Sequence, residues 1–203
     1  MKKIMFNDKY CLTKAVLEGR KTQTRRIIHG LPSDVVGLEI ITLKKSHREY
    51  DEQKRVLSCH TTCRLGKVLN IPYQVGEEVA VAQSYNDINR EFMKKGGESY
   101  GILCSYKSAG MNNKMFVRPG LMPNRIKMTN LRIERLQDIS VEDCLKEGIQ
   151  FDKGRFLVEN DRGVFFYTNS PLLAYRYLIN GTCGKGTWEN NPYVFVYDFE
   201  LIQ

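Results

Sequence analysis

The residues of this chain best suited to chemistry lie close together, between positions 18 and 26. This segment reads EGRKTQTRR, so it brings one lysine, two threonine hydroxyls and three arginines into a short stretch. All of these side chains donate hydrogen bonds, and the planar arginine guanidinium suits phosphate and carboxylate groups in particular. The segment therefore predicts a site that holds a polar or anionic ligand.

The sequence around this segment predicts a corner between a helix and a strand. Asp8 is a suitable helix cap, and apolar residues at helical spacing follow it: Leu12, Ala15, Val16 and Leu17. Gly19 stands where that helix is expected to end. From Thr22 onward the side chains are expected to alternate between two faces of a strand. Lys21 then lies at the turn, and it can approach Thr24 only if the chain bends between them.

The rest of the sequence predicts short strands joined by polar segments, with two clear helices late in the chain. One helix, over residues 140–147, has a capping serine and ends before Gly148, and another opens at Pro171. Residues 44–54 are expected to form a loop or an exposed hairpin, which residues 55–61 could continue. Residues 86–97 and 107–114 are expected to connect elements. The expected strands are 38–43, 79–81, 100–106, 127–136 and 193–201.

Many short strands with two or three short helices predict an α+β fold that is mainly β. The expected architecture is a small β-barrel with the helices over its ends or openings. A chain of 203 residues is long enough for one substantial core and marginal for two. We therefore expect a single domain over residues 1–203 that carries an insertion.

The formal net charge of +8 is concentrated near the start of the chain. Residues 1–30 hold eight lysines and arginines against two acids, whereas residues 131–203 hold eight against eleven. The basic excess therefore surrounds segment 18–26. It favours phosphate-bearing partners such as RNA or nucleotides, through long-range attraction and counterion release. A solvated basic face that keeps the protein soluble is the alternative interpretation.

The sequence predicts a cytoplasmic protein with no membrane partner. No apolar run approaches the roughly 18 residues of a membrane span, and no signal peptide is evident. Six cysteines at irregular positions predict free thiols. Cys59, His60 and Cys63 carry zinc-binding groups, but their spacing is not that of a zinc knuckle, so no metal is predicted. Without a Walker loop, a dinucleotide-binding motif or a Ser/His/Asp set, no cofactor is expected.

Five motifs, in the same order, resemble the ASCH domain family, a PUA-related group of small β-barrels. The likeness is greatest to its phage- and prophage-associated branch. Segment 18–26 resembles the family's G-x-K-x-x-T-x-R signature, and the stretch RIERLQDIS, continuing to EGI, is close to the branch's RVERLQDIS…EGI pattern. The stretch PYQVGEEV resembles the family's PY-x-x-GD turn, and the pairs RP and MP resemble a segment before its central strand. The stretch ING…GKGTW…NNP resembles the branch's INGKGSW-x-x-NPW ending. The match omits about residues 44–70 and 86–114, which are expected to be variable insertions.

The resemblance implies a cleft that binds RNA, a modified nucleoside or a nucleotide. Some small members of the family are amidohydrolases that remove the acetyl group of acetylcytidine with a lysine, a threonine and a glutamate. By resemblance these residues are Lys21, Thr24 and Glu147. The chain therefore has two candidate functions, as a binding module and as an amidohydrolase. The alternative interpretation of Glu147 is a solvated or arginine-paired residue at a helix end.

A threonine hydroxyl becomes a good nucleophile when a neighbouring base, such as a neutral lysine, takes its proton. Free lysine has a pKa near ~10.4, but burial and nearby arginines lower it. Arg20 and Arg25 would act on Lys21 in this way. Arg26 would do so too, and because it shares the strand face of Thr24 it could also stabilise an oxyanion or hold a phosphate. A basic binding corner without chemistry is the alternative.

In a binding module, the lysine and arginines of the segment would contact phosphates, and an aromatic ring would stack on a base. Tyr73, Tyr85 and Trp188 are the aromatic candidates, and each could equally belong to the core. Trp188, the only tryptophan, precedes the last expected strand and could close the pocket. Asn180 and Asn190 could read an amide or a base edge, although asparagine is also a common turn residue.

Overall fold

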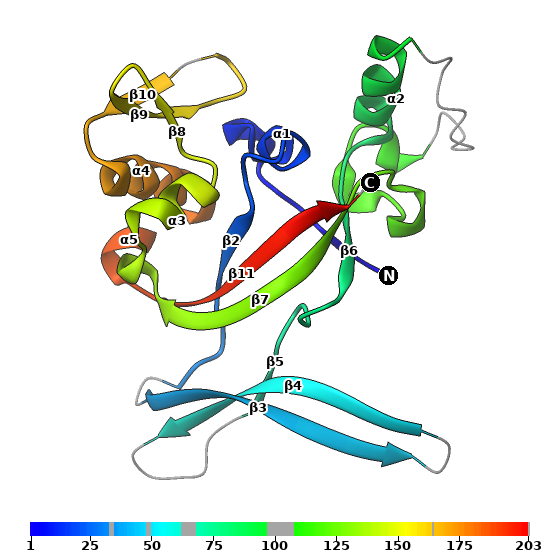
Figure 1. Ribbon diagram of the computed structural model, residues 1–203, viewed down its shortest axis with the longest axis vertical. Helices are drawn as coiled ribbons and strands as arrows, with labels where there is room; N and C mark the ends of the chain where they lie inside the picture. The colour runs from blue at the N-terminus through cyan, green and yellow to red at the C-terminus, as the bar shows by residue number, and fades with distance from the viewer. Residues whose placement is uncertain (33–34, 48–49, 62–67, 97–107, 164, 203) are drawn as a thin grey trace.

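The computed structural model describes residues 1–32, 35–47, 50–61, 68–96, 108–163 and 165–202. Its centre is a five-stranded sheet with the strand order β1-β6-β7-β11-β2. Strands β1 and β6 are parallel, and the other neighbours are antiparallel. Figure 1 shows this main sheet in the middle of the molecule. Its strands are β1 (Lys2–Ile4), β2 (Gln23–Ile27), β6 (Glu78–Val81), β7 (Arg125–Arg135) and β11 (Tyr193–Ile202).

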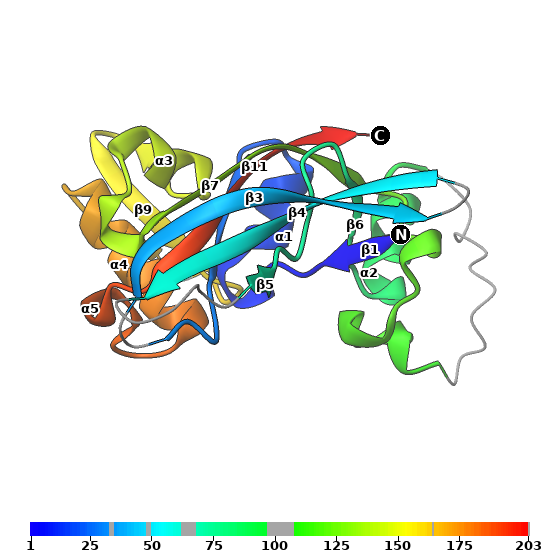
Figure 2. The same ribbon diagram turned by 90° about the horizontal axis from the view of Figure 1, so that it is seen from below.

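Two smaller antiparallel sheets flank the main sheet. One has the order β3-β4-β5 and is built on a long hairpin, and Figure 2 shows that hairpin crossing beneath the main sheet. Its strands are β3 (Val35–His47), β4 (Tyr50–Thr61) and β5 (Val68–Asn70). The other has the order β10-β9-β8, with β8 (Gln150–Asp152), β9 (Arg155–Glu159) and β10 (Phe165–Thr168).

The described part of the chain forms five α-helices. Helices α3, α4 and α5 lie on the same side as the β8–β10 sheet, and α2 lies on the opposite side of the molecule (Figure 1). The helices are α1 (Leu12–Leu17), α2 (Tyr85–Lys94), α3 (Val141–Lys146), α4 (Pro171–Cys183) and α5 (Thr187–Asn190). Short 3₁₀ turns cover Asp8–Tyr10, Ala109–Met111, Lys114–Phe116, Pro119–Leu121 and Leu136–Asp138. None of these helices is both long and apolar enough to cross a membrane.

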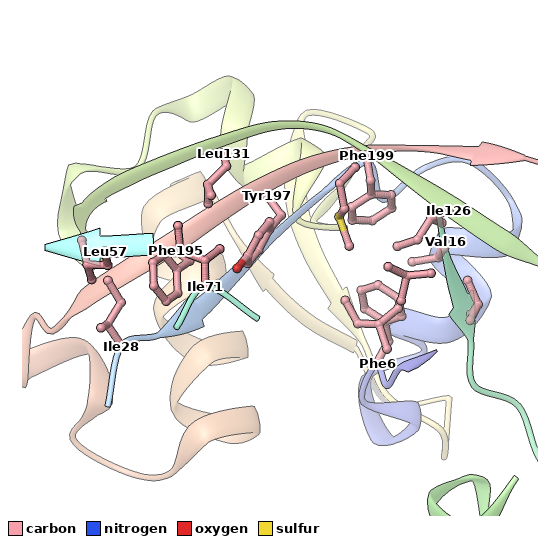
Figure 3. Close-up of a cluster of buried hydrophobic side chains, with 14 residues drawn as sticks. Phe6, Val16, Ile28, Leu57, Ile71, Ile126, Leu131, Phe195, Tyr197 and Phe199 are labelled. Atoms are coloured by element: carbon pink, nitrogen blue, oxygen red, sulfur yellow. The ribbon is translucent and has the colours of Figure 1, made fainter. Parts of the chain in front are cut away.

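Strand β11 separates two hydrophobic cores because its side chains alternate between the two faces of the sheet. Phe195 and Tyr197 belong to the larger core, where Figure 3 shows Phe195 beside Leu57 of the β3–β5 sheet. Val194 and Val196 point the other way, into a core formed with α3, α4 and β9. The two small layers therefore pack on opposite faces of the main sheet.

Several sequence predictions are confirmed by this architecture. The fold is α+β and mainly sheet, and the expected late helices appear as α3 and α4. Ser140 accepts a hydrogen bond from the backbone N–H of Asp143, and Pro171 stands at the start of α4. Residues 44–47 and 50–61 belong to the β3–β4 hairpin, and the last strand is β11. The strand expected over residues 100–106 lies outside the described residues.

Other predictions are wrong or only partly met. Residues 86–97 were expected to connect elements, but Ser84 caps α2 there and Ile88 is buried on its inner face. Asp8 does not cap α1, because it lies within a 3₁₀ turn that is capped by Asn7. The described residues form five α-helices rather than two or three. The strand pairings of the described residues do not close into a barrel, since β1 and β2 remain as the two edges of the main sheet.

Candidate functional site

The corner predicted around Lys21 is present and is held by backbone hydrogen bonds. Helix α1 ends at Gly19, whose φ of +72° is the left-handed conformation that glycine adopts without strain. The backbone N–H groups of Arg20 and Lys21 both donate to the carbonyl oxygen of Ala15, each at 2.9 Å. The N–H of Thr22 then donates to the carbonyl of Lys146 at 3.0 Å. This last bond joins the start of β2 to the end of α3.

The end of α3 brings Glu147 to the same place. Gly148 follows with a φ of +104°, and the N–H of Ile149 donates to the carbonyl of Cys144 at 3.2 Å. This is the hydrogen-bond pattern of a helix that ends in a left-handed glycine. A Cβ atom at Gly148 would lie 3.7 Å from the Cβ of Lys21. The two chain corners therefore meet closely, and Lys21 faces Glu147.

Lys21 and Glu147 form a buried ion pair. The residues are 2% and 4% exposed, and the ammonium Nζ lies 2.5 Å from Oε2 of Glu147. The same ammonium donates to the backbone carbonyl of Glu147 at 2.8 Å. Burial lowers the pKa of Lys21, and the charges of Arg26 and Arg25 lower it further, although Glu147 opposes them. Of these influences on the pKa, burial is the largest.

Arg25 lies on the inner side of this pair, and its side chain is fully buried. Its guanidinium donates to Oε1 of Glu147 at 3.3 Å and to Oδ2 of Asp143 at 2.8 Å. It also forms an ion pair with Glu134. Three carboxylates thus surround one guanidinium. Glu147 is consequently held between Lys21 on one oxygen and Arg25 on the other.

A second set of hydrogen bonds holds Asp143 in place. The guanidinium of Arg132 donates to Asp143 at 2.5 Å and to Asp198 at 3.0 Å. The amide of Gln23 donates to the same two carboxylates, at 3.1 Å and 2.6 Å. Burial alone would raise the pKa of Asp143, but the hydrogen bonds from Arg25 and Gln23, with the charge of Arg132, hold it below its usual value. Asp143 therefore stays ionised and anchors Arg25.

These residues border a pocket of about 270 Å³. Its charged side chains are Lys21, Arg25, Arg26 and Glu147, and its apolar walls come from Met5, Phe6, Leu12, Leu178 and Ile179. Neutral polar groups come from Asn7, Thr24, Tyr175, Thr182 and Cys183. Lys21 and Glu147 are nearly covered, whereas Arg26 is half-buried. The pocket can therefore offer cationic, hydroxyl and apolar contacts to one small ligand.

Two hydroxyls of the pocket have no protein partner. Thr24 is 4% exposed, and its hydroxyl makes no hydrogen bond within the described residues. The hydroxyl of Tyr175 is buried, and it too lacks a hydrogen-bond partner in the part of the chain that the structure describes. Burial raises the pKa of Tyr175 well above its usual value, so this phenol stays neutral. Buried polar groups usually have a partner, so the enclosed hydroxyl of Tyr175 points to a ligand.

Arg26 differs from the other cations of the pocket. One end of its guanidinium donates to the backbone carbonyl of Met5 at 2.8 Å, and its centre lies 5.6 Å from the ring of Phe6. Its Nε has no hydrogen-bond partner, and no carboxylate within the described ranges forms an ion pair with it. Arg26 therefore keeps its positive charge available to a ligand.

The structure brings five predicted site residues together and leaves four apart. Arg20 pairs with Glu18 at the surface, and Tyr73 packs edge-on against another tyrosine while its hydroxyl donates to a backbone carbonyl at 3.2 Å. Trp188 and Asn190 lie on α5, outside the pocket lining. Tyr85, a further aromatic candidate, is buried in the core beside α2.

Sequence reasoning missed three residues of the site. Asp143 lies in the first turn of α3, where acidic residues are common, and Tyr175 lies among the buried residues of α4. No sequence pattern around Phe6 indicates that it belongs to the site. Each reaches the pocket region by long-range packing, which local spacing does not reveal.

The cysteine and histidine side chains considered for zinc do not form a site. Cys59 is buried on β4, while its neighbour His60 is exposed, as alternation along a strand requires. Cys63 lies outside the described residues. Among the residues that are described, no three metal-binding side chains gather closely enough to hold an ion.

Comparisons with known proteins add no relative. No family model matches this chain, and neither the curated proteins nor the solved structures contain a significant match. The resemblance to ASCH domains therefore rests on the five sequence motifs alone.

Proposed function

We propose that this pocket binds a nucleoside or nucleotide, either free or as part of RNA. The observation that carries the proposal is the convergence of Lys21, Thr24, Arg25 and Arg26 from one segment with Glu147 from a distant one. The pocket also presents the ring of Phe6 among its apolar walls, and apolar walls with a few polar groups are typical of ligand sites. Membership of the ASCH family is part of the same proposal and is supported by the five sequence motifs.

The size of the pocket favours a single nucleoside unit over a longer strand. Its volume of about 270 Å³ is near the lower end of the roughly 300–1,000 Å³ that is usual for small-molecule sites. In the RNA case, one nucleotide would enter the pocket and the remaining strand would lie outside it. Binding is tested by calorimetry with nucleosides and nucleotides.

A second candidate function is hydrolysis of an acetylated nucleoside. The observations that favour it are the lowered pKa of Lys21 and the unpartnered hydroxyl of Thr24 in the same pocket. A neutral Lys21 would accept the proton of Thr24 while the threonine oxygen attacks the acetyl carbonyl carbon. Arg26 would stabilise the negative oxygen that forms. The C–N bond then breaks, and the leaving amine takes the proton from Lys21.

The reaction would be completed by water. A water molecule attacks the acetyl group on Thr24, Lys21 accepts a proton from that water, and acetate leaves as the threonine oxygen takes the proton back. Glu147 has the role of holding the amine of Lys21 in place through both steps. The net reaction converts acetylcytidine and water to cytidine and acetate.

Incubation with acetylcytidine separates the two candidate functions. Hydrolysis predicts release of cytidine and acetate, and Thr24→Val should abolish the release, since valine has the shape of threonine without its nucleophilic hydroxyl. Arg20→Gln is the matched control, because Arg20 belongs to the same segment but lies outside the pocket. Binding without turnover would support the binding module alone. Absence of both would contradict the proposed function.

A further inference from the structure

The charges around the pocket are almost fully paired with one another. Four cations take part in a single network of ion pairs: Lys21, Arg25, Arg132 and Lys146. Four carboxylates complete it: Glu134, Asp143, Glu147 and Asp198. This network therefore has no net charge. The floor of the pocket, where Lys21 and Glu147 lie, offers a ligand no uncompensated charge.

Arg26 stands outside that network. No described carboxylate lies within ion-pair distance of it, and within the described residues its guanidinium donates a hydrogen bond only to the carbonyl of Met5. Its Nε is covered from solvent and has no partner. A guanidinium has five N–H groups in a planar fork that matches phosphate oxygens. A charge that is partly desolvated and unpaired is costly, and an anionic ligand would remove that cost.

The other lining residues indicate the polarity and shape of the rest of the ligand. The hydroxyls of Thr24 and Tyr175 are uncharged, and Phe6, Leu178 and Ile179 provide apolar surface. These groups suit a neutral body that has polar atoms and a flat apolar face. Arg26 is more exposed than Lys21 and Glu147, so an anion bound to it would lie nearer the opening of the pocket.

We infer that the ligand is a nucleoside that carries a phosphate group, with the phosphate on Arg26 and the nucleoside towards Thr24 and Tyr175. This inference rests on the proposed function and narrows it, because an uncharged nucleoside would leave Arg26 unpaired. The phosphate could belong to a free nucleotide or to the terminal nucleotide of an RNA strand. The chemistry at Arg26 is the same in both.

Titration calorimetry with matched ligands tests the inference. The probes are the four ribonucleosides, their 5′-monophosphates and a 5′-phosphorylated oligoribonucleotide. On the unchanged protein, at least one monophosphate should bind about tenfold or more tightly than its nucleoside, which corresponds to about 1.4 kcal/mol. Arg26→Gln should remove this difference, because the neutral glutamine amide cannot pair with the charge of the phosphate. Arg20→Gln, the control, should behave as the unchanged protein does.

The outcomes distinguish this inference from the function on which it rests. Equal affinity for nucleosides and monophosphates on the unchanged protein would overturn the inference and leave the proposed function standing. This measurement does not require the Arg26→Gln variant, so it decides the inference even if that variant does not fold. An equal loss of affinity for both ligands in Arg26→Gln would also overturn it. If no probe binds at all, the proposed function fails too. Tighter binding of the oligoribonucleotide than of every monophosphate would support the inference with an RNA terminus as the source of the phosphate.

Discussion

Three arginines of one short segment have three different environments. Arg20 pairs with Glu18 at the surface, Arg25 is enclosed by carboxylates, and Arg26 lies at the pocket without an ionic partner among the described residues. The strand alternation predicted from the sequence places Arg25 and Arg26 on opposite faces, and their partners agree with it. What alternation could not supply is the identity of those partners. Glu147 is 122 residues from Arg25 in the chain.

Arg25 is expected to be essential for stability, because it is the cation shared by three carboxylates. Arg25→Gln leaves Glu147 and Asp143 buried with one fewer positive charge. Removal of one partner from a buried ion pair typically costs about 3–5 kcal/mol. Urea unfolding should show a loss of this order, whereas Arg20→Gln should stay within about 0.5 kcal/mol because its ion pair is partly exposed. Similar losses in both variants would contradict the proposed anchoring role of Arg25.

Lys21 is expected to make stability depend on pH. Unfolded lysine keeps its proton up to about pH 10.4, whereas the folded protein releases the Lys21 proton at a lower pH. Between the two pKa values the unfolded state binds more protons, so the free energy of unfolding rises with pH in that window. Each unit of pKa difference contributes about 1.4 kcal/mol.

The measurement compares the unchanged protein with Lys21→Met by urea unfolding from about pH 7 to about pH 10. Other groups that titrate in this range are common to both proteins, so their contributions cancel in the difference. The unchanged protein should gain stability relative to Lys21→Met as the pH rises. Parallel pH profiles would show that the folded and unfolded pKa values of Lys21 are equal.

Among the elements, those with strong end signals were predictable and those defined by packing were not. Ser140 and Gly148 bound α3 as expected, and Pro171 opens α4. Residues 86–97 looked like a polar connection, yet α2 forms there. Its composition is polar because only a narrow face, with Tyr85 and Ile88, is buried against the neighbouring turns. The helix is strongly amphipathic, so its low average hydrophobicity, rather than a lack of periodicity, made the segment resemble a connection.

The turn after α3 positions Glu147, so a change at Gly148 should disturb the site. Gly148 has a φ of +104°, which side chains rarely adopt, and a Cβ there would approach Leu12 at 3.4 Å. Gly148→Ala should therefore cost about 1–3 kcal/mol of stability and displace Glu147 from Lys21. Thermal unfolding measures the loss of stability, and ligand affinity reports the displacement of Glu147.

Gly120→Ala is the matched control for this turn. Gly120 does not have a positive φ, and an added Cβ would meet no atom within 4 Å. Its stability should stay within about 0.5 kcal/mol of the unchanged protein. An equal loss of stability in Gly120→Ala and Gly148→Ala would mean that the strained turn at Gly148 does not cause the loss.

At the scale of the whole molecule, the sequence predicted the class of fold but not the arrangement of its sheets. Composition and spacing suffice to indicate a mainly β protein with short helices. The parallel pairing of β1 with β6 and the central place of β11 depend on contacts between residues far apart in the chain. The Lys21–Glu147 pair spans 126 positions in the same way. Local patterns do not encode such pairings, so segment 18–26 could be predicted as a site from its own residues, but Glu147 could be named only by resemblance.

The β3–β5 sheet should unfold together with the rest of the protein, because its residues enter the larger core. Leu57 of β4 is completely buried there beside Phe195 of the main sheet (Figure 3). Leu57→Ala should cost about 2–5 kcal/mol through lost burial and a cavity. Val68→Ala on the neighbouring strand β5 is the control, since Val68 is 51% exposed and should change stability little.

Trp188 provides a readout of cooperativity, because it is the only tryptophan and packs against the core on the other face of the main sheet. If the molecule is one cooperative unit, Leu57→Ala should move the urea midpoint of Trp188 fluorescence as far as that of circular dichroism, with the slope unchanged. A fluorescence midpoint that stays in place while the dichroism midpoint falls would instead show that the β3–β5 sheet unfolds separately. In that case, destabilising substitutions in the hairpin would leave the pocket folded, because the pocket lies with the main sheet. If the molecule is one unit, the same substitutions would unfold the pocket as well.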